Sequence, residues 1–144
     1  MGEISTEENE KIVARIYENA MTALHSNEPI TAAQRIVHDI EHMMQEVNSG
    51  ASYEQYFRWT SVDEIKSISE HLRALGLDTV AQLTDHAIKI AFPGGMPSNE
   101  EAKSDATEWS SEQEEILSDL FKQLEEHNGH VTNVLGAYAK RVGA

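Results

Sequence analysis

The chain has 144 residues and a formal net charge of −14, because 25 acidic residues stand against 11 Lys and Arg. A field of this sign repels nucleic acids and anionic membranes and attracts basic partners, so we do not expect direct binding to DNA, RNA or a membrane. The absence of cysteine excludes disulfides and a cysteine nucleophile. The N-terminus lacks the basic and apolar regions of a signal peptide, and no apolar run reaches the roughly 18 residues of a membrane span. We therefore expect a cytoplasmic protein.

Apolar residues recur at helical spacing along most of the chain, and capping patterns mark where helices begin. Three pairs have the S/T-x-x-E/Q spacing of a capping box: Ser5 with Glu8, Thr31 with Gln34, and Ser61 with Glu64. Gly76 is predicted to close the helix that Ser61 opens, and Asp78 to cap the next one. Turn signals fall at 27–29, 48–50, 92–97 and 128–129.

No segment alternates between apolar and polar residues as a half-buried strand would. The sequence therefore predicts an all-α protein, a single compact domain of about seven or eight helices. Within it, residues 1–29 form an N-terminal helix and linker, 30–97 a helical core, and 98–144 the acidic C-terminal helices.

An aromatic cluster follows the turn at 48–50, on a predicted short helix. It consists of Tyr53, Tyr56, Phe57 and Trp59. Aromatic side chains bury more area than other side chains, so we predict that these four form the centre of the core. Arg58 is predicted to stack on a ring or to pair with an acidic helix. The alternatives for the cluster are a small-ligand pocket or the interface of a homodimer, since Tyr and Trp are enriched in interfaces.

Five motifs occur in a distinctive order along the chain. They are E-V-N-S-G at 46–50, Y-E-Q-Y-F at 53–57, L-R-A-L-G at 72–76, A-I-K-I-A-F-P-G-G-M-P at 87–97 and L-F-K-Q-L at 120–124. In this order they resemble the DNA-mimic protein family, an all-helical family with acidic members that imitate DNA towards DNA-binding proteins. The resemblance extends from near Ile30 to near Tyr138. It implies an all-α fold and a basic DNA-binding protein as partner.

The acidic residues concentrate between Ser98 and Asn128, where ten of them stand against two lysines. Six are spaced 4, 3, 4, 3 and 4 residues apart, and we call them the acidic stripe: Glu101, Asp105, Glu108, Glu112, Glu115 and Asp119. On one helix, neighbouring members would have their Cβ atoms about 5 to 6 Å apart, a plausible imitation of a row of phosphates. Trp109, on the adjacent apolar face, would anchor the segment.

Two alternatives to this interpretation remain. Ser111 with Glu114 has the spacing of another capping box, so the segment is either one helix or two with a kink near Trp109, which would split the stripe. Acidic helix faces also commonly serve solubility alone.

One histidine pair has the spacing of metal ligands. His38 and His42 lie at i and i+4 in H-D-I-E-H, so both rings project from one helical face. The sequence is not H-E-x-x-H, because Asp39 holds the place of the catalytic glutamate, and no third ligand is indicated. They are weak candidates, and we expect no metal and no cofactor.

No nucleophile elbow and no phosphate-binding loop is present, so we do not predict an enzyme. The predicted function is a non-enzymatic protein-binding module, most specifically a DNA mimic. Its acidic stripe would occupy the DNA-binding surface of a basic transcription factor or nucleoid protein. The alternatives are a metal- or small-ligand-dependent activity centred on His38 and His42, or a protein that shares only the family's fold.

Overall fold

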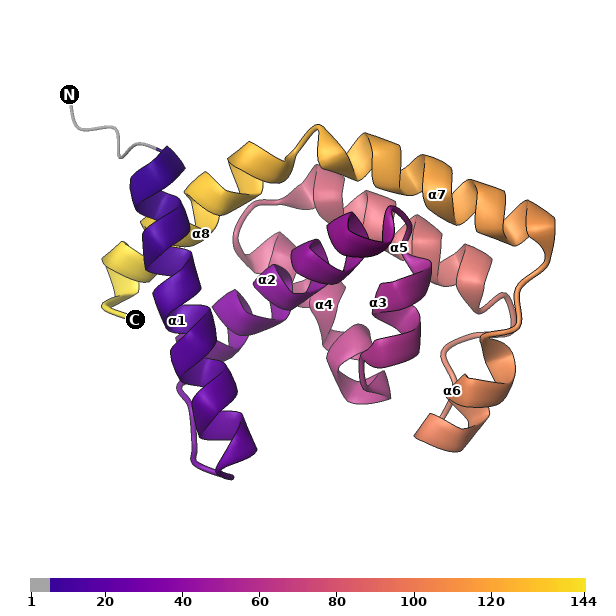
Figure 1. Cartoon of the computed structure of the whole chain (residues 1–144), viewed down its shortest axis with the longest axis horizontal. Coiled ribbons are helices and arrows are strands. Elements are labelled where there is room, and N and C mark those ends of the chain that lie inside the picture. The colour runs from indigo at the N-terminus through magenta and orange to yellow at the C-terminus, as the bar shows by residue number, and fades with distance from the viewer. Residues whose placement is uncertain (1–5) are drawn as a thin grey trace. The chain divides into compact units, whose positions relative to one another are not determined.

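The computed structural model describes residues 6–144, which form eight helices and no strand (Figure 1). The all-α prediction is confirmed. The helices are α1 (Thr6–His25), α2 (Ala32–Gly50), α3 (Glu54–Trp59), α4 (Val62–Ala74), α5 (Asp78–Ala91), α6 (Glu100–Ala106), α7 (Ser111–Glu125) and α8 (Asn128–Val142). The predicted capping box at Ser5 lies outside the described residues. In that part of the chain, no helix is both long and apolar enough to cross a membrane.

The chain divides by its contacts into two compact units. Unit 1 contains the chain up to His42 together with Asn128–Ala144, and unit 2 contains Met43–His127. Helix α2 begins in unit 1 and ends in unit 2. The assignment of all residues to a single domain stays a prediction.

Unit 1 is organised around the contact between α1 and α8 (Figure 1). At their crossing, a Cβ atom added to Gly136 would lie 2.0 Å from Oδ1 and 2.8 Å from Cβ of Asn9. Asn9 is 2% exposed, and its Nδ2 donates a hydrogen bond of 2.9 Å to Oδ1 of Asn133. Position 136 therefore has to be glycine because the backbone of α8 lies so close to a fixed side chain.

Most helix ends follow the predicted signals. Both hydrogen bonds of the capping box between Thr31 and Gln34 are present, at 3.0 and 2.9 Å. Gly76 follows the end of α4 with a φ of 75°, the conformation that a glycine at a helix end allows. The prediction that Asp78 caps α5 is wrong, because Leu77 takes the N-cap position. The amide of Leu77 donates to the Leu72 carbonyl at the end of α4, so the residue that closes α4 also precedes α5, and Asp78 is the first residue of α5.

The aromatic cluster of α3 is buried except for one member. Tyr53, Tyr56 and Phe57 are fully buried, but Trp59 is 74% exposed, so its prediction as a core residue is wrong. The first three residues have i, i+3, i+4 spacing and therefore share one helical face. Trp59 is three positions after Tyr56 but two after Phe57, which places it beyond the edge of that face, on the side of Tyr56 away from Phe57.

A different tryptophan completes the aromatic core of unit 2. Phe57 meets Phe92 and Trp109 in edge-on contacts, with ring centroids 5.4 and 6.5 Å apart. Trp109 comes from the segment between α6 and α7. The predicted anchoring role of Trp109 is thus confirmed, and this residue occupies the place expected of Trp59.

Lys103 joins α6 to the C-terminal end of α3. Its side chain is almost fully buried, and Nζ donates to the carbonyls of Phe57 at 2.8 Å, Arg58 at 3.1 Å and Thr60. The last carbonyls of a helix lack partners within the helix, and a cation satisfies them well. Burial lowers the pKa of Lys103, and the carboxylate of Glu100, 3.8 Å away, opposes that shift.

Replacing Gly136 with Ala should destabilise unit 1 by about 1–3 kcal/mol, because the new methyl group overlaps Asn9. Chemical denaturation monitored by circular dichroism measures the change in the free energy of unfolding. Gly129→Ala in the same helix is the control, since nothing lies within 4 Å of a Cβ at that position. Equal stability of the two variants would contradict the close packing at Gly136.

Replacing Lys103 with Met should destabilise unit 2 by about 1.5–3 kcal/mol, because three carbonyls lose a charged donor. The same unfolding measurement tests this. Lys122→Met is the control, because its side chain is 71% exposed and its ion pair with Asp119 lies on the surface. Such pairs contribute at most about 1 kcal/mol. Equal losses in the two variants would show that Lys103 does not hold α3.

Candidate partner-binding surface

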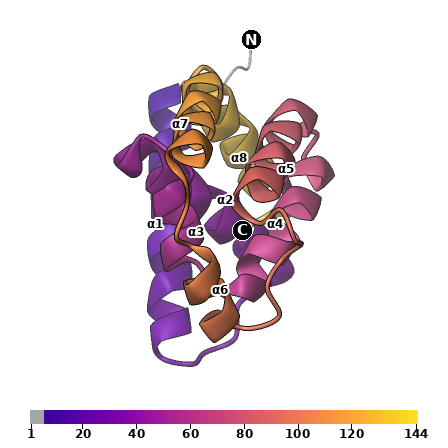
Figure 2. The same cartoon turned by 90° about the vertical axis from the view of Figure 1, so that its right-hand side faces the viewer.

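The acidic stripe lies in unit 2, distributed over two helices and the turn between them. Glu101 and Asp105 are on α6, Glu108 is in the turn, and Glu112, Glu115 and Asp119 are on α7. All six side chains are exposed. The sequence left open whether this segment forms one helix or two, and the structure has two, since α6 ends at Ala106 and α7 begins at Ser111 (Figure 2).

The capping box that opens α7 lies one residue earlier than predicted. Ser110, and not Ser111, exchanges hydrogen bonds of 3.1 and 2.9 Å with Gln113, and not Glu114. The amide group of Gln113 can donate as well as accept, and its Nε2 also donates to the Ile90 carbonyl at 2.8 Å. A carboxylate in that position could not make this third bond, because it has no donor. The start of α7 is thus fixed to the end of α5.

The turn that splits the stripe is held by Arg58 and Trp109. The Arg58 guanidinium lies 4.9 Å from the ring centroid of Trp109 and donates to the Thr107 carbonyl at 3.1 Å. The indole nitrogen of Trp109 donates to the Ala91 carbonyl at 3.0 Å. The prediction that Arg58 stacks on a ring is confirmed, although the sequence did not indicate which ring. Glu108 stands between two residues whose backbone positions these contacts fix.

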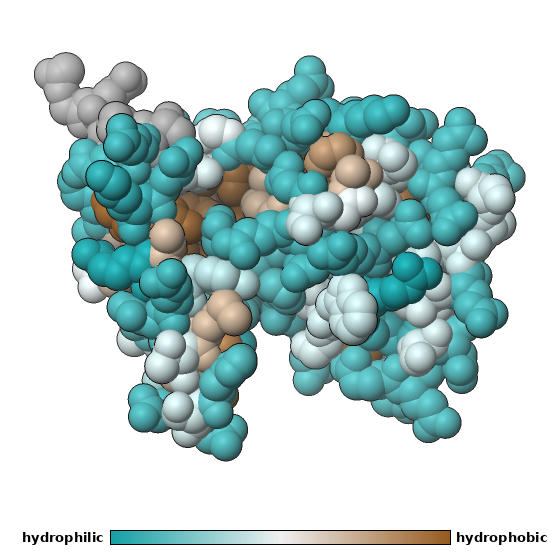
Figure 3. All heavy atoms as spheres, in the orientation of Figure 1, coloured by the Kyte–Doolittle hydropathy of each residue, from teal (hydrophilic) through white to brown (hydrophobic). Residues whose placement is uncertain are grey.

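Helix α7 turns its apolar side inward and its carboxylates outward. Leu117, Leu120 and Leu124 are buried, and α7 packs along α5 (Figure 1). Ile116, one residue before Leu117, is only half-buried. Hydrophilic side chains lie along the outer side of α7 (Figure 3).

The cations near the stripe have unequal effects on its charge. Lys122 lies 3.8 Å from Asp119, with both side chains largely exposed, so this pair offsets one charge of the stripe only weakly. Lys103 is the only cation of α6, and its charge is directed inward to the end of α3. The exposed charges of α6 are therefore all carboxylates.

Glu114 and Glu54 form a second feature of this region, which the sequence did not indicate. Burial raises the pKa of Glu54, and the neighbouring carboxylate of Glu114 adds to the rise. A hydrogen bond from the Ser52 hydroxyl and the charge of Arg58 act in the opposite direction. Glu54 is in the first turn of α3, where the helix dipole favours a negative charge. The pKa of Glu54 is nevertheless raised, because burial and the like charge of Glu114 outweigh these opposing effects.

The two candidate metal ligands lie on one face of α2, as predicted. His38 is buried, and its Nδ1 lies 2.8 Å from Oδ1 of Asp39. Its ring stacks between those of Tyr17 and His42, at centroid distances of 5.2 and 5.8 Å. These contacts give His38 a packing role. The metal hypothesis for the pair stays a prediction.

Replacing Glu54 with Gln should raise the melting temperature at about pH 7 and change it little at about pH 4. A raised pKa means that the stabilising contribution of Glu54 is complete at low pH and is lost as the pH rises through the folded-state pKa. Gln mimics the protonated form and retains an acceptor for Ser52. Thermal unfolding over this pH range tests the prediction, with Glu125→Gln, an exposed change on α7, as control. A pH-independent difference would contradict it.

Family comparison agrees with the resemblance seen in the motifs. Residues 28–142 match the family model described as DMP19-like protein, a range that includes the whole acidic stripe. Neither the curated proteins nor the solved structures contain a match to this chain. Membership of the matched family suggests a DNA-mimic role. With the match covering most of its length, the chain belongs to the DMP19-like protein family.

Proposed function

We propose that this protein is a non-enzymatic DNA mimic whose unit 2 binds the DNA-binding surface of a basic protein, such as a transcription factor or nucleoid protein. Family membership suggests the general role. The observation that carries the proposal is the distribution of charge. Unit 2 contains seventeen Asp and Glu and six Lys and Arg, a formal charge of −11 out of −14. All six members of the acidic stripe face solvent.

The carboxylates act as substitutes for phosphates. Glu112, Glu115 and Asp119 follow one another at i+3 and i+4 along α7, so their Cβ atoms are about 5 to 6 Å apart. Glu101 and Asp105 repeat this spacing on α6. A protein surface that exchanges counterions for DNA phosphates can exchange them for these groups, and the affinity falls as salt rises.

The fixed turn makes the surface ready for binding. Contacts of Arg58, Trp109 and Gln113 hold the segment between α6 and α7 to the rest of unit 2. A surface that is already ordered loses less conformational entropy on association. Repulsion between like charges at i+3 and i+4 destabilises α7 by a few tenths of a kcal/mol per pair, and the buried leucines of α7 offset it.

The first experiment is a pull-down from a bacterial lysate with the immobilised protein, at low and high salt and with competing duplex DNA. We expect capture of a basic DNA-binding protein at low salt, with release by salt and by DNA. Capture that is indifferent to DNA would contradict mimicry and would favour an inhibitor of another basic protein, such as a nuclease.

The variant Glu108→Lys/Glu112→Lys/Glu115→Lys should lower the affinity for the captured protein at least about tenfold, because each change replaces an attraction with a repulsion. The matched control is Glu10→Lys/Glu18→Lys/Glu28→Lys, which makes the same change in net charge at exposed positions of unit 1. Titration of the purified proteins, monitored by calorimetry, gives both affinities. Equal losses would show that net charge, and not the stripe, determines binding.

The histidine pair provides the comparison with the competing hypothesis. His38→Ala/His42→Ala should leave the affinity for the captured protein unchanged under mimicry. A metal- or small-ligand-dependent activity at this pair predicts the reverse: loss of activity in the histidine variant and retention in the lysine variant.

A further inference from the structure

The acidic stripe has one member whose backbone is not part of a helix. Five of its carboxylates stand on α6 or α7, where the helical backbone sets the direction of each side chain. Glu108 lies in the turn between these helices and is exposed. It is also the member that links the pair on α6 to the three on α7. The continuity of the stripe therefore depends on how that turn is held.

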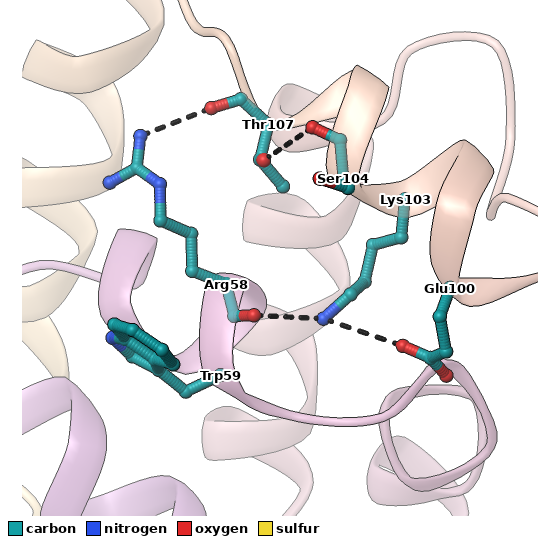
Figure 4. Close-up of a pocket in the computed structure, with 6 residues that line it drawn as sticks. All are labelled: Arg58, Trp59, Glu100, Lys103, Ser104 and Thr107. Carbon is teal, nitrogen blue, oxygen red and sulfur yellow. Dashed lines mark hydrogen bonds and ion pairs between the residues drawn. The ribbon is translucent and has the colours of Figure 1, made fainter.

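Arg58 reaches the turn from α3 and contacts both neighbours of Glu108. Its Nη2 donates a hydrogen bond of 3.1 Å to the carbonyl of Thr107 (Figure 4), which belongs to the peptide group that leads into Glu108. Its guanidinium carbon lies 4.9 Å from the ring centroid of Trp109, within the range of a cation–π contact. A single side chain thus holds the residues before and after Glu108.

Close packing does not fix this guanidinium. Arg58 is exposed and stands beside a pocket of about 420 Å³ (Figure 4). The pocket is lined by Arg58, Trp59, Glu100, Lys103, Ser104 and Thr107. A long side chain beside open space takes one position only where specific contacts hold it, because ordering it costs conformational entropy. The contacts with the turn therefore determine where the guanidinium lies.

By its charge alone, Arg58 would oppose the proposed function. A cation beside the stripe repels a basic partner, so its removal would strengthen binding. Lys122 is a cation of that kind, largely exposed and 3.8 Å from Asp119. Arg58 differs from Lys122 because its charged group is engaged by two residues of the turn.

We infer that Arg58 is a positioning residue for the partner-binding surface: it holds the turn at Glu108 in one conformation, so that the basic partner meets an ordered row of carboxylates across both helices. This role rests on the proposed function. It gives the two cations opposite effects. Loss of Arg58 weakens binding although it makes the surface more negative, whereas loss of Lys122 strengthens binding.

The first test needs no partner. The indole N–H of Trp109 donates to the Ala91 carbonyl at 3.0 Å, so its hydrogen exchange, followed by ¹⁵N NMR, measures how firmly the turn is held. The other tryptophan, Trp59, is 74% exposed and serves as the internal reference. Arg58→Met should speed exchange at Trp109 about threefold or more, and Lys122→Met should leave it unchanged. Equal exchange in Arg58→Met and the unaltered protein overturns the inference.

The second test measures the affinity for the captured DNA-binding protein by calorimetry. Arg58→Met should lower the affinity about threefold or more, because the turn then has to be ordered on binding. Lys122→Met, the matched change of charge, should raise it. An affinity that rises or stays the same in Arg58→Met overturns the inference.

A double-mutant cycle separates positioning from a general loss of stability. Glu108→Gln should lower the affinity of the unaltered protein about threefold but change that of Arg58→Met little, because the carboxylate is no longer held in place there. Asp119→Asn, at the far end of the stripe on α7, should have the same effect in both backgrounds. If Glu108→Gln also has equal effects in the two backgrounds, Arg58 does not act through Glu108 and the inference is overturned.

Failure of the proposed function is distinguishable from failure of this role. If the unaltered protein captures no DNA-binding protein, the proposed function fails, and Arg58 has no partner surface to position. Exchange at the Trp109 indole still decides whether Arg58 orders the turn. If the partner is captured and Arg58→Met binds it as tightly as the unaltered protein does, the positioning role alone is wrong.

Discussion

The ammonium group of Lys103 determines much of what unit 2 presents to solvent. In bonding to the carbonyls of Phe57, Arg58 and Thr60, it ends α3 and fixes α6 beside it. The same bonds remove the only cation of α6 from the surface. A strongly hydrated charge is costly to bury unless its hydrogen bonds are replaced, and here the end of a helix replaces them. One interaction thus serves packing and leaves the outer side of α6 uniformly negative.

Local signals in the sequence predicted the parts of the fold that depend on neighbouring residues. Helical periodicity, the capping box of Thr31 and Gln34, and the closing glycine at Gly76 all involve groups within one turn of each other. Asp78 failed as a cap because Leu77 is held by a bond back to α4. The hydrogen bond from Leu77 to Leu72 depends on how the chain passes from α4 to α5. The spacing of apolar residues within each helix does not predict that connection.

Two further errors have a common cause in tertiary contacts. The sequence does not distinguish Trp59 from Trp109 as the partner of Phe57. The contact between Phe57 and Trp109 joins two parts of the chain that are far apart in sequence, and helical periodicity carries no information about such contacts. The sequence likewise does not show that Gln113 bonds to Ile90, which selects Ser110 as the cap of α7. For the candidate surface, the six exposed carboxylates could be predicted from their spacing. The pocket at Trp59 could not, since it is built from the end of one helix and the side of another.

The two lysines of the acidic segment are under opposite constraints. Lys122 is exposed and close to Asp119, so a modification that neutralises it, such as acetylation, would leave Asp119 without its nearest cation and make α7 more anionic. Lys103 is buried against three carbonyls, so it is shielded from modifying enzymes, and neutralising it would release α6 from α3. Substitutions at position 122 can therefore change the charge of the surface without altering the fold, whereas substitutions at position 103 cannot.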